Sequence, residues 1–315
     1  MRDVFINRLT ELAAADPRIM LITGDLGFGV LNEYQKRLPG QYLNAGVAEQ
    51  NMTGLATGLA LDGRIVFTYS IANFPTLRCL EQIRNDACYH DANVKIVAVG
   101  GGFSYGQLGM SHHATECLSI LRVLPGITIV APGDDWEARE SADALIKTPG
   151  TCFIQLDRAS AASSGLPGEM FQLGRARRLR EGSDLTLVCT GGILGDTLAA
   201  AESLTEEGIA CRVLQMHTLK PFDDEAIFAA ARETGGILSI EEHTIEGGLG
   251  GLIAETCLEA GVLPRSFYRI GLRSGFATVV GSQPYLRKHY EIDTEAIKTA
   301  ARRLCAARTL VRLSA

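Results

Sequence analysis

The sequence predicts an α/β protein made of two doubly wound domains, the first with a mostly parallel sheet and the second smaller. Three observations support this prediction. Short runs rich in β-branched residues alternate with segments of helical periodicity along most of the chain. A stretch of small residues at 159–174 separates two such series. The length of 315 residues exceeds what one small core usually contains. We therefore predict domains at 1–165 and 180–315.

The first domain is expected to open with a helix, because Phe5, Leu9 and Leu12 recur at helical spacing. Further helices are expected around 30–37, from Glu49 onward, and at about 75–87 and 114–123. The expected strands follow the β-branched runs at 19–23, 42–44, 64–68, 94–99, 127–131 and 152–156. Short strands that alternate with helices indicate a parallel sheet covered on both faces.

The second domain repeats this alternation. Its expected strands are the apolar runs at 185–190, 209–214, 236–240 and 266–270, with helices between them. A closing helix is expected at 294–307.

The composition excludes several classes of function. The net charge is −6 and no run of basic residues occurs, which argues against nucleic-acid binding. The 46% of hydrophobic residues suits a subunit that buries a large interface. Eight scattered cysteines without a Cys-x-x-Cys pair suggest buried free thiols in a reducing cytoplasm rather than disulfides or zinc. No signal peptide and no membrane-spanning apolar stretch is recognised, so we expect a cytoplasmic protein that does not contact membranes.

The most informative segment is 44–52, which places Glu49 on the first turn of an apolar helix dotted with glycines. A carboxylate is rarely placed among apolar residues unless something uses or neutralises it. Proton transfer is one such use. The alternative is an acid that complements the positive end of the helix dipole.

Three further segments stand in a fixed order around this one: Gly24-Asp25-Leu26, Glu81-Gln82-Ile83-Arg84-Asn85 and Ser111-His112-His113. Near the C-terminus, Glu241-Glu242-His243 precedes Gly247-Gly248-Leu249-Gly250. With these motifs, nearly the whole chain resembles the C-terminal half of transketolase-type enzymes, which depend on thiamine diphosphate. The resemblance implies a pyrimidine-binding domain followed by the small C-terminal domain of that family.

The resemblance assigns roles toward the cofactor. Glu49 corresponds to the carboxylate that contacts the aminopyrimidine ring and assists its proton transfer. Phe74 corresponds to the aromatic residue that stacks on this ring, although a core Phe at a turn would explain it equally. Asp25 follows a strand end, where ligands gather in such sheets, and corresponds to an acid near the cofactor. A turn or capping Asp is the alternative.

The resemblance also assigns roles toward a sugar substrate. His112 corresponds to a histidine that bonds the oxygens of the ketose donor and moves protons, and His113 beside it is a second candidate. Arg2 and Arg158 correspond to arginines that hold a sugar phosphate. Each arginine alone could equally form an ordinary surface ion pair.

The part of the family that grips the diphosphate is missing from the chain. This grip uses Gly-Asp-Gly and a later Asn to hold a divalent metal, and no Gly-Asp-Gly occurs here. We therefore expect one subunit of a split transketolase. An N-terminal partner subunit would supply the diphosphate and metal ligands for Mg²⁺ or Ca²⁺, in an α2β2 assembly, and this chain alone would be inactive.

Departures from the family pattern bear on the substrate. Leu108 stands where sugar transketolases place an Asp that reads a hydroxyl, and Leu cannot accept that hydrogen bond. Gly100 and Gly29 replace a phosphate-contacting His and a Ser, and Ile71 replaces a second aromatic residue. We therefore expect a non-standard sugar rather than a common pentose phosphate.

Two other functions fit the same motifs. A decarboxylating relative, such as a 2-oxo acid dehydrogenase E1 β-subunit or a deoxyxylulose phosphate synthase, would use a 2-oxo acid donor and release carbon dioxide. A regulatory subunit without chemistry is the third possibility, against which both Glu49 and His112 are present.

Overall fold

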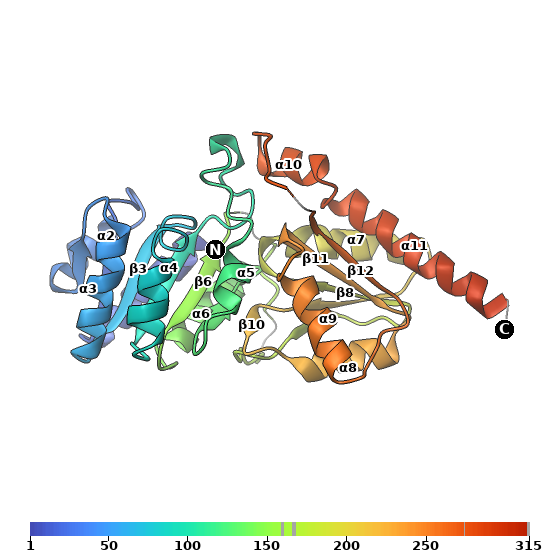
Figure 1. The fold of residues 1–315 in the computed structure, drawn as a ribbon, viewed down its shortest axis with the longest axis horizontal. Coiled ribbons are helices and arrows are strands. Elements are labelled where there is room, and N and C mark those ends of the chain that lie inside the picture. Colours follow the sequence, from blue (N-terminus) through green and yellow to red (C-terminus); the bar gives the residue numbers. More distant parts are fainter. Residues whose placement is uncertain (159–160, 166–167, 274, 314–315) are drawn as a thin grey trace.

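The computed structural model describes residues 1–158, 161–165, 168–273 and 275–313. Two α/β units lie side by side, each with helices on both faces of a sheet (Figure 1). The predicted fold class is therefore confirmed. The proposed boundaries at 165 and 180 stay a prediction, and residues 159–160, 166–167, 274 and 314–315 lie outside the described part.

The described residues of the first unit form a seven-stranded sheet with the order β10-β5-β6-β4-β3-β1-β2. Its strands are β1 (Ile19–Thr23), β2 (Tyr42–Asn44), β3 (Ile65–Ile71), β4 (Val94–Val99), β5 (Thr128–Val130), β6 (Cys152–Leu156) and β10 (Thr218–Lys220). All of these pairings are parallel except that of β10 with β5. The carboxyl ends of β1, β3, β4 and β6 therefore meet at one edge.

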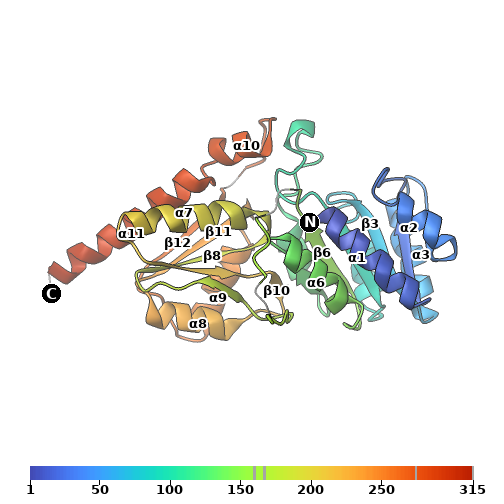
Figure 2. The same ribbon diagram turned by 180° about the vertical axis from the view of Figure 1, so that it is seen from behind.

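Helices cover both faces of this sheet. The face seen in Figure 1 carries α3 (Glu49–Leu61), α4 (Leu80–Gln82), the π-helical segment η2 (Ile83–Cys88) and α5 (Cys117–Arg122). The opposite face carries α1 (Arg2–Ala15) and α6 (Asp135–Leu145), which pack against each other (Figure 2). The small helix α2 (Asn32–Arg37) lies beside α1, and the 3₁₀ turns η1 (Pro39–Gln41) and η3 (Gly106–Leu108) complete the unit. Each face has its own buried apolar cluster, around Met52 and Phe67 respectively.

The second unit has a five-stranded sheet in its described residues, with the order β12-β11-β8-β9-β7. Its strands are β7 (Arg177–Arg180), β8 (Leu185–Cys189), β9 (Cys211–Gln215), β11 (Ile237–Thr244) and β12 (Phe267–Leu272). The 3₁₀ turn η4 (Gly191–Ile193) follows β8. One face is covered by α7 (Leu194–Glu206), α10 (Gln283–His289) and α11 (Thr294–Leu313), and the other by α8 (Asp224–Glu233) and α9 (Leu249–Glu259).

The structure differs from the predicted elements in a few places. The helix expected at 75–87 begins only at Leu80 and continues as a π-helix. The residues before it form turns, in which Thr76 Oγ1 donates to the Ala72 carbonyl. The elements that were not predicted include β7, β10 and α10. Among the described residues, no helix combines the length and the apolar character needed to cross a membrane.

The two units are joined by more than the linker. β10 leaves the second unit and pairs with β5, so that Thr218 lies opposite Val130 and Lys220 opposite Ile129. The backbone N–H of Ala131 also donates to the carbonyl of His217. One strand of the second half of the sequence thus extends the first sheet.

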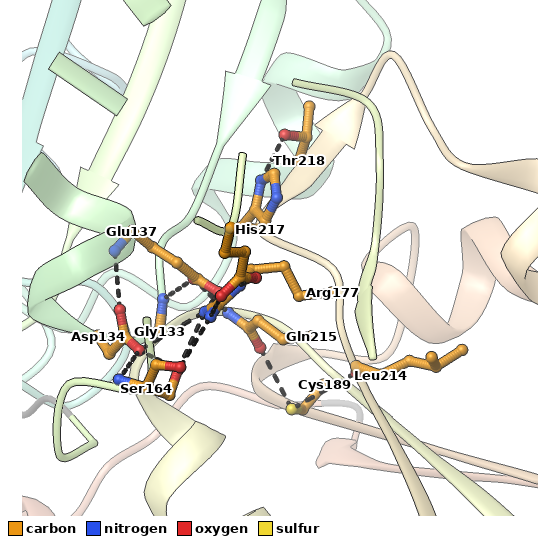
Figure 3. A network of polar contacts seen from close by, with 11 residues as sticks. Gly133, Asp134, Glu137, Ser164, Arg177, Cys189, Leu214, Gln215, His217 and Thr218 are labelled. Carbon is orange, nitrogen blue, oxygen red and sulfur yellow. Dashed lines mark hydrogen bonds and ion pairs between the residues drawn. The ribbon is translucent and has the colours of Figure 1, made fainter. Parts of the chain in front are cut away.

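A buried network of polar side chains accompanies this strand (Figure 3). Glu137 on α6 accepts hydrogen bonds from Arg177 Nη1 at 2.7 Å and from Gln215 Nε2 at 3.2 Å, both in the second unit. Its Oε2 also accepts from the Gly133 N–H at 2.7 Å. Burial lowers the pKa of the neighbouring His217 to about 4, so this imidazole is neutral at pH 7. The network holds the second sheet against α6.

A second buried junction lies at the end of β6. Asp157 Oδ2 accepts a hydrogen bond of 2.6 Å from the N–H of Gly192 in the second unit. Glu242 on β11 and Arg287 on α10 form an ion pair beside it. Burial, together with the charge of Glu242, raises the pKa of Asp157 to about 7, while Arg287 opposes this shift.

This raised pKa predicts how stability changes with pH. Folded Asp157 binds its proton more tightly than the unfolded chain does, so its contribution is complete below about pH 4 and is lost as the pH rises through about 7. Replacing it in Asp157→Asn removes the cost of ionisation, at most about 4 kcal/mol at high pH. We expect the unfolding free energy of the variant, relative to wild type, to increase between pH 5 and pH 8.

Urea unfolding at several pH values measures this difference. Asp62→Asn serves as the control because Asp62 is exposed at the end of α3, and its difference from wild type should stay constant. A difference for Asp157→Asn that does not change with pH would contradict the prediction.

Candidate active site

The site is built from Glu49, the first residue of α3. A turn at Gly46, with a φ of 75°, leads the chain from β2 into this helix. The side chain of Glu49 is only 4% exposed, and Gly24 at the end of β1 lies against it. A Cβ atom at Gly24 would stand 3.5 Å from Glu49 Cγ, so β1 and the helix start pack closely here.

Arg78 connects Glu49 to Phe74. Its Nη1 lies 3.2 and 3.1 Å from the two carboxylate oxygens of Glu49, while its guanidinium carbon lies 4.3 Å from the centre of the Phe74 ring. The side chain of Arg78 remains 51% exposed. Sequence reasoning missed this residue, although a cation four positions after the candidate stacking residue Phe74 was a usable signal.

His112 reaches the same place from another loop. This loop follows β4, and the rings of His112 and Phe74 meet edge to face with centres 5.3 Å apart. The imidazole Nδ1 lies 3.0 Å from Ser111 Oγ. Burial lowers the pKa of His112, and the charges of His113 and Arg78 lower it further. The side chain is therefore mostly neutral at pH 7 and can exchange a proton there.

Asn73 fastens this loop to the turn that carries Phe74. Its Nδ2 donates to the carbonyl oxygens of Ser111 at 3.1 Å and His113 at 2.8 Å. Asn73 is buried, so these bonds are shielded from water. Asn73, the neighbour of Phe74, thus fixes the backbone on both sides of His112 relative to Phe74.

His113 lies in a different environment from His112. Its side chain is 3% exposed, its Nε2 lies 3.1 Å from the Gly106 carbonyl, and its ring meets Phe103 edge to face. The predicted substrate contact of His113 stays untested. This burial favours a role inside the loop.

Asp25 lies exposed at the end of β1, in a left-handed conformation with a φ of 59°. Its Oδ1 accepts a hydrogen bond of 2.9 Å from Asn44 Nδ2, and its N–H donates to Asn44 Oδ1. Asn44 Oδ1 also accepts from the N–H of Gly46. Asp25 is therefore tied to the turn that leads into Glu49.

Of the two arginines predicted to bind phosphate, Arg158 lies beside Tyr105. The guanidinium carbon of Arg158 is 5.5 Å from the centre of the Tyr105 ring. Asp3 raises the pKa of Arg2 through a hydrogen bond, and the nearby Tyr69 and Tyr105 contribute to the shift. The Tyr105 ring in turn lies 6.4 Å from that of His112. Through Tyr105 the structure therefore brings Arg158 to the side of the site that His112 occupies, whereas the ion pair given for Arg2 is with Asp3.

Leu108 lies at the tip of the loop, where its side chain is 57% exposed, close in sequence to Met110 at 60%. Among the described residues, no group of three His, Cys, Asp or Glu side chains is placed to hold a metal ion. The site thus offers a buried carboxylate, an aromatic ring, an imidazole and two guanidinium groups at one sheet edge.

Two family models together match most of the chain. The family model "Transketolase, pyrimidine binding domain" matches residues 1–162, and "Transketolase, C-terminal domain" matches residues 174–297. The chain is 38% identical to one of the subunits of the apulose-4-phosphate transketolase of Phocaeicola vulgatus, covering 95% of this chain and 96% of that protein. It is 35% identical to the 6-deoxy-6-sulfo-D-fructose transketolase subunit SqwH of a Clostridium species, with coverage of 96% and 93%.

A solved structure is similar over the same span. It is that of a split-gene transketolase in an inactive beta4 tetramer, and it superposes with a TM-score of 0.87 at 33% identity. The match covers 97% of this chain and 97% of that one.

Proposed function

The chain belongs to the transketolase family as a C-terminal subunit of the split type, and we propose that it completes a two-chain, thiamine diphosphate-dependent transketolase. Together with its partner it would transfer a two-carbon ketol unit from a ketose donor to an aldehyde or ketone acceptor. The observation that carries this proposal is that the buried Glu49 and the half-buried Phe74 and His112 converge at one sheet edge.

The residues present fit the aminopyrimidine end of thiamine diphosphate. Glu49 is buried, and the partner of its two oxygens is the half-exposed Arg78, so the carboxylate can accept a hydrogen bond from a ring that approaches from solvent. Phe74 is half-buried and offers a ring for stacking. When bound, the cofactor supplies the carbon nucleophile that takes up and releases the two-carbon unit.

The chain's own residues have separate roles in this proposal. Glu49 would hold a proton at a ring nitrogen of the pyrimidine, and Phe74 would fix the plane of the ring. His112, with its lowered pKa, would take a proton from a donor hydroxyl and return it to the acceptor. Arg2 and Arg158 would bind an anionic group of the sugar. Asp25 would hold the turn before Glu49.

The diphosphate and its Mg²⁺ or Ca²⁺ are assigned to the partner. We propose that this partner is an N-terminal transketolase subunit, and that two copies of each chain assemble as α2β2. The relatives that are named as single subunits of a transketolase support the division into two chains. The eight cysteines, most of them buried, suit a reducing cytoplasm.

The substrate is proposed to be a non-standard sugar. Leu108 offers no hydrogen-bond acceptor at the loop tip, and two relatives are named for apulose-4-phosphate and 6-deoxy-6-sulfo-D-fructose rather than a common pentose phosphate. These names support a modified sugar for this chain without identifying it.

Reconstitution tests the activity. The chain mixed with the product of a neighbouring gene that encodes Gly-Asp-Gly, with thiamine diphosphate and Mg²⁺, should transfer ketol units between sugars without releasing carbon dioxide, and neither chain alone should do so. Product analysis and carbon dioxide trapping measure both outcomes. Release of carbon dioxide from pyruvate or a branched 2-oxo acid would replace this proposal with a decarboxylating one.

Glu49→Gln tests the proton transfer. The amide keeps the shape and an acceptor for Arg78 but cannot hold the proton, so kcat of the reconstituted pair should fall roughly 10²- to 10⁴-fold. Association of the two chains, followed by gel filtration, should not change. Glu33→Gln, on the exposed side of α2, is the control for charge loss. Unchanged turnover in Glu49→Gln would exclude the role.

Leu108→Asp tests the substrate argument. A carboxylate at the loop tip restores an acceptor for a sugar hydroxyl, so kcat/KM for common sugar phosphates should rise roughly tenfold relative to the native substrate. Met110→Asp adds the same charge to an equally exposed side chain of this loop and should have no such effect. An equal change of kcat/KM in the two variants would contradict the role given to position 108 in substrate choice.

A further inference from the structure

The loop that carries His112 is held by the second unit of the chain as well as by its own. We propose that the C-terminal domain positions this loop, residues 100–113, through Glu242, which makes Glu242 a positioning residue for His112. This inference rests on the proposed function for its consequence in catalysis. We call the contact between Glu242 and the loop 100–113 the clamp, and its existence can be tested separately from catalysis.

Glu242 lies on β11 of the second sheet and accepts a hydrogen bond from the backbone N–H of Phe103 in the loop. Gln283 Nε2 donates to both of its oxygens, at 2.9 and 3.1 Å, and Arg287 pairs with it. Arg287 also pairs with Asp196 on α7 at 2.6 Å. The carboxylate is 7% exposed, so it is fixed by buried donors from two directions.

Glycines in the loop provide the space for this contact. A Cβ atom at Gly102 would stand 2.4 Å from Glu242 Oε1, and the φ of Gly102 is 55°. A Cβ atom at Gly106 would stand 2.4 Å from Leu286 Cδ1 on α10 and 2.7 Å from the Gly281 carbonyl. A side chain at Gly102 would displace the Glu242 carboxylate from the loop, and one at Gly106 would collide with the backbone of Gly281.

The contact continues through the loop to the histidines. The ring of Phe103 stacks on Tyr290 of the second unit, with centres 5.4 Å apart, and meets His113 edge to face at 5.1 Å. The Gly106 carbonyl accepts from the Gly281 N–H at 3.2 Å and lies 3.1 Å from His113 Nε2. The residue next to His112 is therefore fixed between the two units.

The neighbouring residue on β11 provides a matched control. Glu241 is also fully buried, but as the adjacent residue of the strand it faces the opposite side. Its oxygens accept from the N–H groups of Leu249 at 2.7 Å and Gly250 at 2.8 Å at the start of α9. Glu241 and Glu242 thus differ in what they hold, while their type and burial are alike.

Hydrogen–deuterium exchange of the intact chain tests the clamp. In Glu242→Ala the amides of the loop 100–113 should exchange roughly tenfold faster or more, because a buried donor loses its acceptor, while the first turn of α9 keeps its rate. Glu241→Ala should show the reverse pattern. Glu242→Gln retains an acceptor for the Phe103 N–H and should restore part of the protection, and as the milder change it keeps the test valid if the Ala variant does not fold.

The catalytic consequence is measured on the reconstituted pair. Glu242→Ala should lower kcat much more than it raises KM for the donor, and Glu242→Gln should recover part of kcat. Glu241→Ala should leave both kcat and KM for the donor unchanged. Equal acceleration of loop and α9 in Glu242→Ala, or an unchanged loop, would overturn the clamp. A wild-type pair that turns over no sugar, with the exchange pattern as expected, would count against the proposed function and still support the clamp.

Discussion

The candidate site depends on one constraint, the parallel pairing of β1, β3, β4 and β6. These strands are apolar and buried on both faces, so their direction and register are fixed by packing. Because all four end at the same edge, Asp25, Phe74, the loop after β4 and Arg158 meet there although more than a hundred residues separate the first from the last. Without this pairing none of the contacts with Glu49 could form.

Most of the fold could be predicted because the local sequence of most strands has a recognisable pattern. Runs such as 94–99 and 152–156 are mostly apolar and include β-branched residues, and the structure places both in the middle of the sheet. β10 could not be found in this way. It is three residues long and contains Lys220, and it forms only because β5 offers an open edge to it. The late start of the helix after Phe74 was also not predicted, because the hydrogen bond from Thr76 Oγ1 to the Ala72 carbonyl is not visible in the periodicity of the sequence.

The candidate site was predictable where a residue type contradicts its surroundings, and less so elsewhere. Glu49 stands out because a carboxylate in an apolar helix is unusual. Arg78 and Glu242 make their contacts across 29 and 139 positions of sequence. The spacing from Phe74 could suggest that Arg78 lies near the site, but no local pattern shows that it pairs with Glu49 or that Glu242 binds the loop. His112 and His113 show the limit most clearly. They are identical neighbours, and His113 is the buried one because it packs against Phe103 and lies 3.1 Å from the Gly106 carbonyl, contacts that the sequence does not show.

The ion pair between Glu49 and Arg78 explains why this half of a site can exist without the other half. A buried carboxylate needs a hydrogen-bond donor, because burying its oxygens without one costs free energy of folding. Arg78 supplies that donor, but its own side chain is 51% exposed and can return to water at little cost. The chain therefore keeps Glu49 paired while it is free, with a partner that a better-placed donor can replace. The Glu137–Arg177 network and the Asp157 junction hold the two units together around this edge, so the geometry that such a donor would meet is already formed within one chain.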